Sequence, residues 1–135
     1  MGIRCFIYTV IYEAKRFLAG FKEIGPITGQ VGVVSDVSGY HADWDFCFDL
    51  VDIDPERDFN RTHYVRLHCE ITICDRKRLQ QFIDELTRRW NQGDRNIKVR
   101  LSGQLAYDPA HIPGLPTDPN LLEIHPVTAA QFVAP

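Results

Sequence analysis

The amino-acid sequence predicts a mainly β fold with helices: a five-stranded OB-like β-barrel with an additional N-terminal helix. Five segments alternate apolar and polar residues with the period of two that half-buried strands show. One segment between the third and fourth of them instead repeats apolar residues at helical spacing. The resulting order, β-β-β-α-β-β, is that of OB-folds, in which the helix closes the bottom of the barrel. The 135 residues, 44% of them hydrophobic, suit one domain, with the helix in 1–22 and the barrel in 27–134.

Residues 3–21 are predicted to form the N-terminal helix. Their apolar residues recur every three or four positions and so share one face. These residues are Ile3, Phe6, Ile7, Val10, Ile11, Ala14, Phe17, Leu18 and Phe21. The glycines and proline of GFKEIGP end the pattern. We expect the apolar face to pack on the domain and cover one open end of the barrel. The β-branched and aromatic content leaves a strand as the alternative.

The first two strands follow at 27–39 and 44–53. The first alternates from Ile27 to Val37, and Gly29 and Gly32 within it predict a bend or bulge. The second, WDFCFDLVDI, has an apolar face and a polar face, which predicts a half-buried strand. The apolar face holds Trp44, Phe46, Phe48 and Leu50, and the other holds Asp45, Cys47 and Asp49.

The third strand, residues 63–74, alternates through ten consecutive positions. Val65, Leu67, Cys69, Ile71 and Ile73 are expected to face inward, and Tyr64, Arg66, His68, Glu70 and Thr72 outward. Residues 75–93 then carry an apolar stripe at helical spacing: Leu79, Phe82, Ile83, Leu86 and Trp90. Asp75 is expected to cap the N-terminus of this helix, and Gly93 to follow its C-terminus.

The last two strands are predicted at 97–107 and from about Leu121 onward. The final strand is expected to kink at Pro126 and to run toward Phe132 and Val133. A barrel removes the sheet edges that five strands would otherwise expose. An open α+β sheet remains the rival architecture, because strand order cannot be read from one sequence.

Composition bears on the compartment and on the cysteine chemistry. No apolar run approaches the roughly 20 residues that a membrane-spanning helix needs, and charged residues interrupt the N-terminal run where a signal peptide would need small ones. We therefore expect a soluble, cytoplasmic protein without a membrane partner. Four cysteines without a CxxC pair are few for a disulfide scaffold, so Cys5, Cys47, Cys69 and Cys74 are interpreted as buried thiols.

The net charge of −3 is unevenly distributed along the chain. Residues 36–58 carry eight acidic residues against Arg57, a net charge of −7. Residues 75–100 carry eight basic and four acidic residues, a net charge of +4. Two solvated surfaces explain this distribution. The alternative is a basic patch beside the helix that meets an acidic partner, and this patch is modest for nucleic acid.

The stretch YDPAHIPGLPTDPNLLEIHP places Asp108 and His111 before a proline-rich loop and Glu123 and His125 after it. If residues 105–108 pair with 122–125, the four side chains gather near one end of a hairpin. Glu123 and His125 are two positions apart in a strand, so they leave the same face.

Such a set is compatible with three roles. Imidazole and carboxylate ligands suit a divalent transition metal such as zinc, iron or manganese. They equally suit a general acid–base pair. In a purely structural role, Asp108 starts a turn and His125 bonds to Glu123 or to a loop carbonyl.

The segments YDPAH and LEIHPV together resemble a pattern in uncharacterised bacterial OB-fold-like proteins, where a strand ending YDxxH precedes one reading EIHP. The resemblance covers about the last 30 residues, and Asp108, His111, Glu123 and His125 are the matching positions. It implies an OB-like fold and no particular activity.

OB-folds bind their ligands on the outer face of the second and third strands. The ligand-binding candidates on that face are Asp45, Asp49, Tyr64, Arg66 and His68. One aromatic among mixed charges suits single-stranded nucleic acid poorly. We therefore expect a non-catalytic module that binds a protein partner or a small polar ligand. The alternative is a metal-dependent hydrolase built on the hairpin residues, although the chain has no nucleophile motif, phosphate loop or HExxH.

Self-association through the N-terminal helix is a further hypothesis. Tyr8, Tyr12 and Phe21 widen its apolar surface beyond what a small barrel covers. The competing expectation is the capping role described above.

Overall fold

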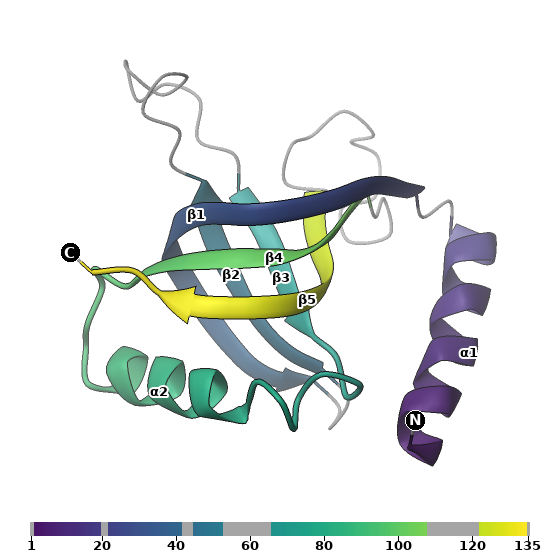
Figure 1. The fold of residues 1–135 in the computed structure, drawn as a ribbon, viewed down its shortest axis with the longest axis horizontal. Coiled ribbons are helices and arrows are strands. Elements are labelled where there is room, and N and C mark those ends of the chain that lie inside the picture. The colour runs from purple at the N-terminus through teal and green to yellow at the C-terminus, as the bar shows by residue number, and fades with distance from the viewer. Residues whose placement is uncertain (1, 20–21, 42–44, 53–65, 108–121, 135) are drawn as a thin grey trace.

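The computed structural model describes residues 2–19, 22–41, 45–52, 66–107 and 122–134. Five strands in one sheet and two helices follow one another along the chain (Figure 1). They are α1 (Ile3–Ala19), β1 (Lys22–His41), β2 (Asp45–Asp52), β3 (Arg66–Ile71), α2 (Gln80–Asn91), β4 (Lys98–Tyr107) and β5 (Leu122–Phe132). The predicted order of elements is confirmed. Within these described ranges, no helix is both long and apolar enough to cross a membrane.

The sheet closes on itself in the order β1-β2-β3-β5-β4, so the rival open sheet is not formed. Neighbouring strands are antiparallel except β3 and β5, which are parallel, with His68 opposite Glu123. The predicted hairpin pairing is confirmed, because Leu105 lies opposite Ile124 and the register continues to the start of β5. The closure places residues from β2, β3 and β5 on one continuous outer surface.

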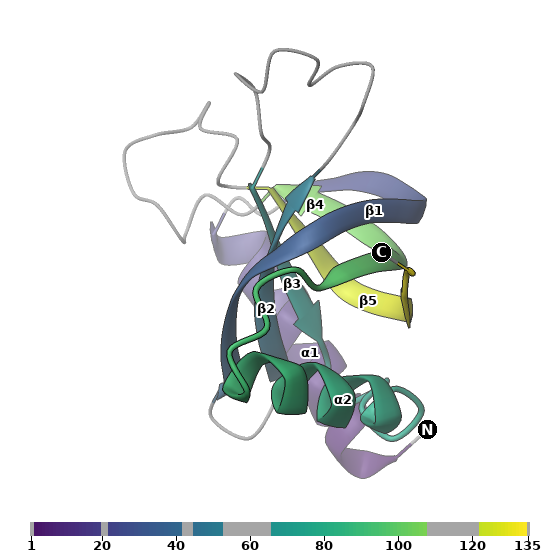
Figure 2. The ribbon, with the colours of Figure 1, turned by 90° about the vertical axis from the view of Figure 1, so that its left-hand side faces the viewer.

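The long first strand makes the closure possible. β1 has 20 residues, pairs with β4 along its first part and with β2 along its second, and curves between them (Figures 1 and 2). The predicted bulge is confirmed at Gly29, whose φ of 67° lies in the left-handed region and where the register with β4 shifts. Gly32 permits close approach, because a Cβ there would lie 2.5 Å from the Val51 carbonyl oxygen.

The core lies inside the ring and is closed at one end by α2 (Figure 2). The inward residues that the structure describes within β2 and β3 are buried as predicted, whereas Trp44 and Val65 lie outside the described residues and Ile73, beyond the end of β3, is half-buried. Phe82 of α2 lies against Phe48 and stacks on Phe132, with ring centroids 6.0 and 4.8 Å apart. The helix begins later than predicted. Asp75 lies in a turn, where its carbonyl oxygen accepts the N–H of Leu79 and its side chain caps nothing.

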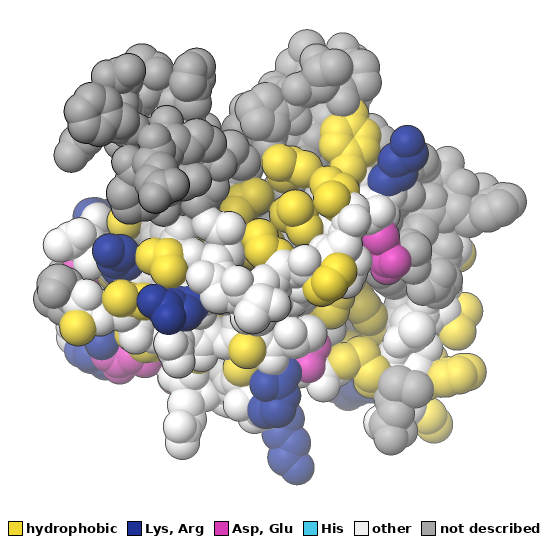
Figure 3. All heavy atoms as spheres, turned by 45° about the horizontal axis from the view of Figure 1, so that its top comes forward, with side chains coloured by type: hydrophobic (Ala, Val, Ile, Leu, Met, Phe, Trp, Pro, Cys, Tyr) yellow, Lys and Arg dark blue, Asp and Glu magenta, His cyan; other side chains and the backbone are white. Residues whose placement is uncertain are grey.

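The expectation that the apolar face of α1 packs on the domain is wrong for its described residues. Ile3 is 78% exposed, and Phe6, Ile7, Val10 and Ile11 are also exposed. Figure 1 shows α1 standing beside the closed sheet, and Figure 3 shows hydrophobic side chains on the surface at that side. The predicted capping of a barrel end therefore does not occur through these residues.

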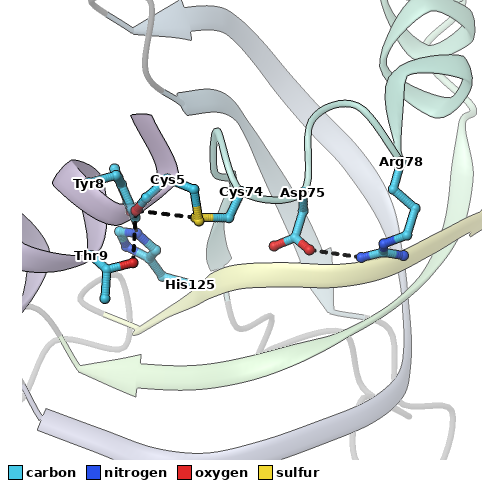
Figure 4. The surroundings of a disulfide bond; sticks show 7 residues. All are labelled: Cys5, Tyr8, Thr9, Cys74, Asp75, Arg78 and His125. Atoms are coloured by element: carbon cyan, nitrogen blue, oxygen red, sulfur yellow. Dashed lines mark hydrogen bonds and ion pairs between the residues drawn. A yellow bond between two sulfur atoms is a disulfide. The ribbon is translucent and has the colours of Figure 1, made fainter. Parts of the chain in front are cut away.

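The interpretation of all four cysteines as thiols is also wrong. Cys5 of α1 and Cys74, just after β3, form a disulfide across 69 positions of sequence (Figure 4). Cys47 and Cys69 are free and buried, as predicted. Disulfides persist in oxidising compartments and are rare in the cytosol, and the cytoplasmic localisation stays a prediction.

Candidate functional site

Much of the outer face of β2 and β3 is buried, in contrast to the half-exposed face that the alternation predicts. Cys47, Asp49 and Glu70 are 2%, 7% and 6% exposed. Period-two alternation identifies which residues share a face, but it cannot show that both faces of a strand are covered. Polar groups buried in this way need hydrogen-bonding or ionic partners.

Two sets of residues that the sequence suggested separately belong to one cluster. The ligand-binding candidates on β2 and β3 and the hairpin residues of β5 meet because β3 lies between β2 and β5. We call the resulting set the polar cluster. It consists of Tyr8, Asp45, Cys47, Asp49, Arg66, His68, Glu70, Glu123 and His125.

His125 stands at one end of the polar cluster and is 3% exposed. Its Nδ1 forms an ion pair with Glu70 Oε2 and lies 3.1 Å from Glu123 Oε1, which confirms that Glu123 and His125 share a face. A hydrogen bond links its Nε2 to the Tyr8 hydroxyl, which α1 brings over the sheet (Figure 4). Both ring nitrogens are therefore engaged.

His68 stands at the other end and is partly exposed. Its Nδ1 is 2.8 Å from Asp49 Oδ1 and its Nε2 is 3.5 Å from Glu70 Oε1. Arg66, whose side chain is largely exposed, donates to the second oxygen of Asp49. Glu70 thus lies between the two imidazoles.

The charged groups of the polar cluster stabilise one another in their ionised forms. Burial opposes protonation of both imidazoles, but contacts with Asp49, Cys47 and Glu70 raise the pKa of His68 to about 12. In the same way, Glu123 and Glu70 outweigh burial and raise the pKa of His125 to about 9. Burial also opposes ionisation of Glu70, but His125 and His68 outweigh it and hold its pKa well below the usual range.

Asp49 and the two buried thiols respond to the same surroundings. Burial opposes ionisation of Asp49, but hydrogen bonds with His68 and Arg66 outweigh it and lower its pKa. Burial raises the pKa of Cys47, whose Sγ donates to Glu70 Oε1 at 3.7 Å, and raises that of Cys69 further. Both thiols are therefore protonated at neutral pH.

Two triads within the polar cluster have the composition of a metal site. One comprises Asp45, Glu70 and His125, and the other Cys47, His68 and Glu70; in each, one ligand atom per residue lies within 4.8 Å of the others. In the tetrahedral coordination that zinc adopts, two ligand atoms lie about 1.6 bond lengths apart, roughly 3.3 to 3.8 Å. Small side-chain movements would therefore bring either triad to coordination distance.

The predicted site residues fall into two groups. Asp45, Asp49, Arg66 and His68 belong to the cluster, as do Glu123 and His125. Tyr64, Asp108 and His111 lie outside the described residues.

Sequence reasoning did not select Cys47 and Glu70 as site residues, although the alternation put them on the correct face. No sequence pattern indicated that Tyr8 belongs to the site, because only the fold brings α1 over β5.

Comparison of this chain with protein-family models, with curated proteins and with solved structures finds no match. The function must therefore be inferred from the geometry of the polar cluster and its surroundings.

Proposed function

We propose that this chain is a non-catalytic binding module with an OB-like barrel, and that its ligand is a divalent transition-metal cation held in the polar cluster. The observation that carries the proposal is the convergence of Asp45, Glu70 and His125 from three adjacent strands. Two carboxylates and an imidazole form a ligand set that suits zinc.

The surroundings of this triad support the proposal. Imidazole ligands of metals usually bond a second partner through the other ring nitrogen, which fixes the ring. The Tyr8 hydroxyl has this relation to His125, because it holds Nε2 while Nδ1 faces the carboxylates. The triad of Cys47 and His68 with Glu70 is the alternative ligand set, and it shares the same central carboxylate.

The OB-like assignment is part of the proposal and rests on topology. The closed order β1-β2-β3-β5-β4, with a helix between the third and fourth strands, is the arrangement expected of an OB-fold. The proposed site lies on the outer face of β2 and β3, where OB-folds bind their ligands. The resemblance of the last residues to bacterial OB-fold-like proteins points the same way and stays a prediction.

Burial makes the hydrolase alternative less favourable. A hydrolytic site must admit a substrate beside its metal, whereas Glu123 and His125 are 1% and 3% exposed. Single-stranded nucleic acid is disfavoured on this face because four acidic side chains converge here and would repel phosphate.

Metal analysis of purified variants tests the proposal. Protein stripped with chelator, equilibrated with Zn²⁺ and dialysed should retain one zinc per chain. Glu70→Gln should lose that zinc, while the matched variant Glu85→Gln, on α2 and outside the polar cluster, should keep it. A metal-free wild type, or a Glu70→Gln variant that retains as much zinc as Glu85→Gln while folded by near-ultraviolet circular dichroism, refutes the proposal.

Cobalt substitution distinguishes the two triads. Thiolate coordination gives cobalt an intense charge-transfer absorption in the near ultraviolet, and carboxylate or imidazole coordination does not. Wild-type protein loaded with Co²⁺ should lack this band, and Asp45→Asn should weaken cobalt binding more than Cys47→Ser. The band, together with its loss in Cys47→Ser, would assign the cation to the triad that contains the thiol.

A second candidate function is self-association through the apolar face of α1. The exposure of Phe6 and Val10, at 57% and 55%, favours burial against a second copy of the chain. Val10→Glu should turn a dimer into a monomer in analytical ultracentrifugation. Thr9→Glu, which adds the same charge away from this face, should leave the dimer intact. A monomeric wild type removes this candidate.

A further inference from the structure

A second polar site, separate from the polar cluster, lies where α1 meets the segment between β3 and α2. A groove of about 400 Å³ is lined by Arg4 of α1, by Ile73, Arg76 and Lys77 of that segment, and by Gln80, the first residue of α2. Its volume is within the usual range for small-ligand sites, roughly 300–1,000 Å³. Neither the metal proposal nor the self-association candidate uses this groove.

The charge of the groove is unusual for this chain. The protein carries a net charge of −3, yet three of the five lining residues are cationic, and none of these described lining residues is acidic. The nearest acidic residue in sequence, Asp75, pairs with Arg78 at 2.9 Å and is not part of the lining. Like charges brought together without an acid among them repel one another, and a bound anion would relieve that repulsion.

The fold holds these charges together by a covalent bond. Arg4 precedes Cys5, and Arg76 and Lys77 closely follow Cys74, so the disulfide brings Arg4 to the groove from a distant part of the sequence. Figure 4 shows how the bond joins α1 to this segment. On the other side, the Arg76 guanidinium lies 4.3 Å from the centre of the Tyr40 ring, and Gln80 donates to the Tyr40 hydroxyl. Arg76 and Gln80 are therefore held in place before any ligand arrives.

We infer that this groove binds a phosphate monoester of the size of a mononucleotide or sugar phosphate. Guanidinium groups match the geometry of phosphate oxygens, and an ammonium group adds a point charge that favours a dianion. Gln80, whose amide nitrogen already donates to the Tyr40 hydroxyl and to Asp84, forms part of the wall, and Ile73 offers an apolar contact for the rest of the molecule. The volume of the groove suits one small molecule and not a polymer.

Titration with inorganic phosphate, AMP and a single-stranded oligonucleotide tests this inference, with amide chemical shifts of the labelled protein as the readout. Phosphate and AMP should shift amides of residues 73–80 at constant ionic strength. Because charged hydrogen bonds are involved, Arg76→Ala combined with Lys77→Ala should weaken binding about tenfold or more. Arg100→Ala, which removes one positive charge at an exposed position of β4 outside the groove, should leave binding unchanged.

Two further variants test the groove if the double variant loses its fold. Arg4 lies at the exposed start of α1, and Arg4→Ala should weaken binding several-fold. Removing the disulfide with Cys5→Ser and Cys74→Ser should also weaken binding several-fold. The inference is overturned if phosphate and AMP shift no amides, or if the groove variants bind as the wild type does. Tighter binding of the oligonucleotide than of AMP, lost in the groove variants, would instead identify a nucleic-acid site.

Discussion

Replacing Glu70 by glutamine removes the negative charge at the centre of the polar cluster and keeps the shape of the side chain. The carboxylate forms an ion pair with His125 Nδ1 and lies 3.5 Å from His68 Nε2. Both imidazoles have raised pKa values, about 9 and about 12, and are protonated at pH 7. The variant therefore leaves one buried and one partly exposed cation with one fewer counter-charge.

The cost of this substitution can be worked from the geometry. Two unit charges about 4 Å apart at an effective dielectric constant of about 20 attract by about 4 kcal/mol. Glutamine also relieves the desolvation of the carboxylate, which offsets part of that loss. Breaking buried pairs by removing one partner costs roughly 3–5 kcal/mol, so we expect a loss near 3 kcal/mol. A domain with about 5–15 kcal/mol of stability would remain folded.

Urea unfolding followed by circular dichroism, with chelator present, measures this loss. The matched control is Glu85→Gln, because Glu85 also pairs with two basic side chains, Arg88 and Arg89, but on the surface. The control should lower the free energy of unfolding by only a small fraction of the Glu70→Gln effect. If the two variants lose the same small amount, the charges of the polar cluster do not stabilise one another.

Three other perturbations test the fold around the cluster. Gly103→Ala should lower the free energy of unfolding by about 2–3 kcal/mol in urea melts, because the new Cβ would lie 2.2 Å from the Pro126 carbonyl oxygen; a neutral effect would contradict this packing. Reducing the Cys5–Cys74 disulfide should speed hydrogen exchange in α1 and leave the strands protected, whereas unchanged protection of α1 would show that other contacts hold the helix. In chelator, the free energy of unfolding should decrease between pH 7 and 10. The pKa of His125 in the folded protein, about 9, exceeds its value of about 6.5 in the unfolded chain. The stabilisation by protonated His125 is therefore complete below about pH 6.5 and is lost as the pH rises through 9. A flat profile would exclude this role.

Local patterns in the sequence were sufficient for the elements and for the register of the last hairpin. Strand alternation and helical spacing are properties of neighbouring residues, so the order of elements after α1, the bulge at Gly29 and the shared face of Glu123 and His125 could all be predicted. The same patterns assigned Phe48 and Leu86 to the core correctly, because burial of one face is what creates the pattern.

Features that depend on what lies next to a face could not be predicted. The placement of β3 between β2 and β5 joined two separate sets of candidates into one polar cluster. Glu70 and Cys47 became candidate metal ligands because the fold buries them beside the two imidazoles. The apolar pattern of α1 predicted a packed face, yet that face is exposed. Cys5 joins the helix to the segment after β3, and Tyr8 joins it to β5. Contacts between residues about 70 or more positions apart are set by how the sheet closes and not by the spacing of residues along the chain. The sequence by itself therefore determined which side chains share a face, and the tertiary structure decided which of those faces meet.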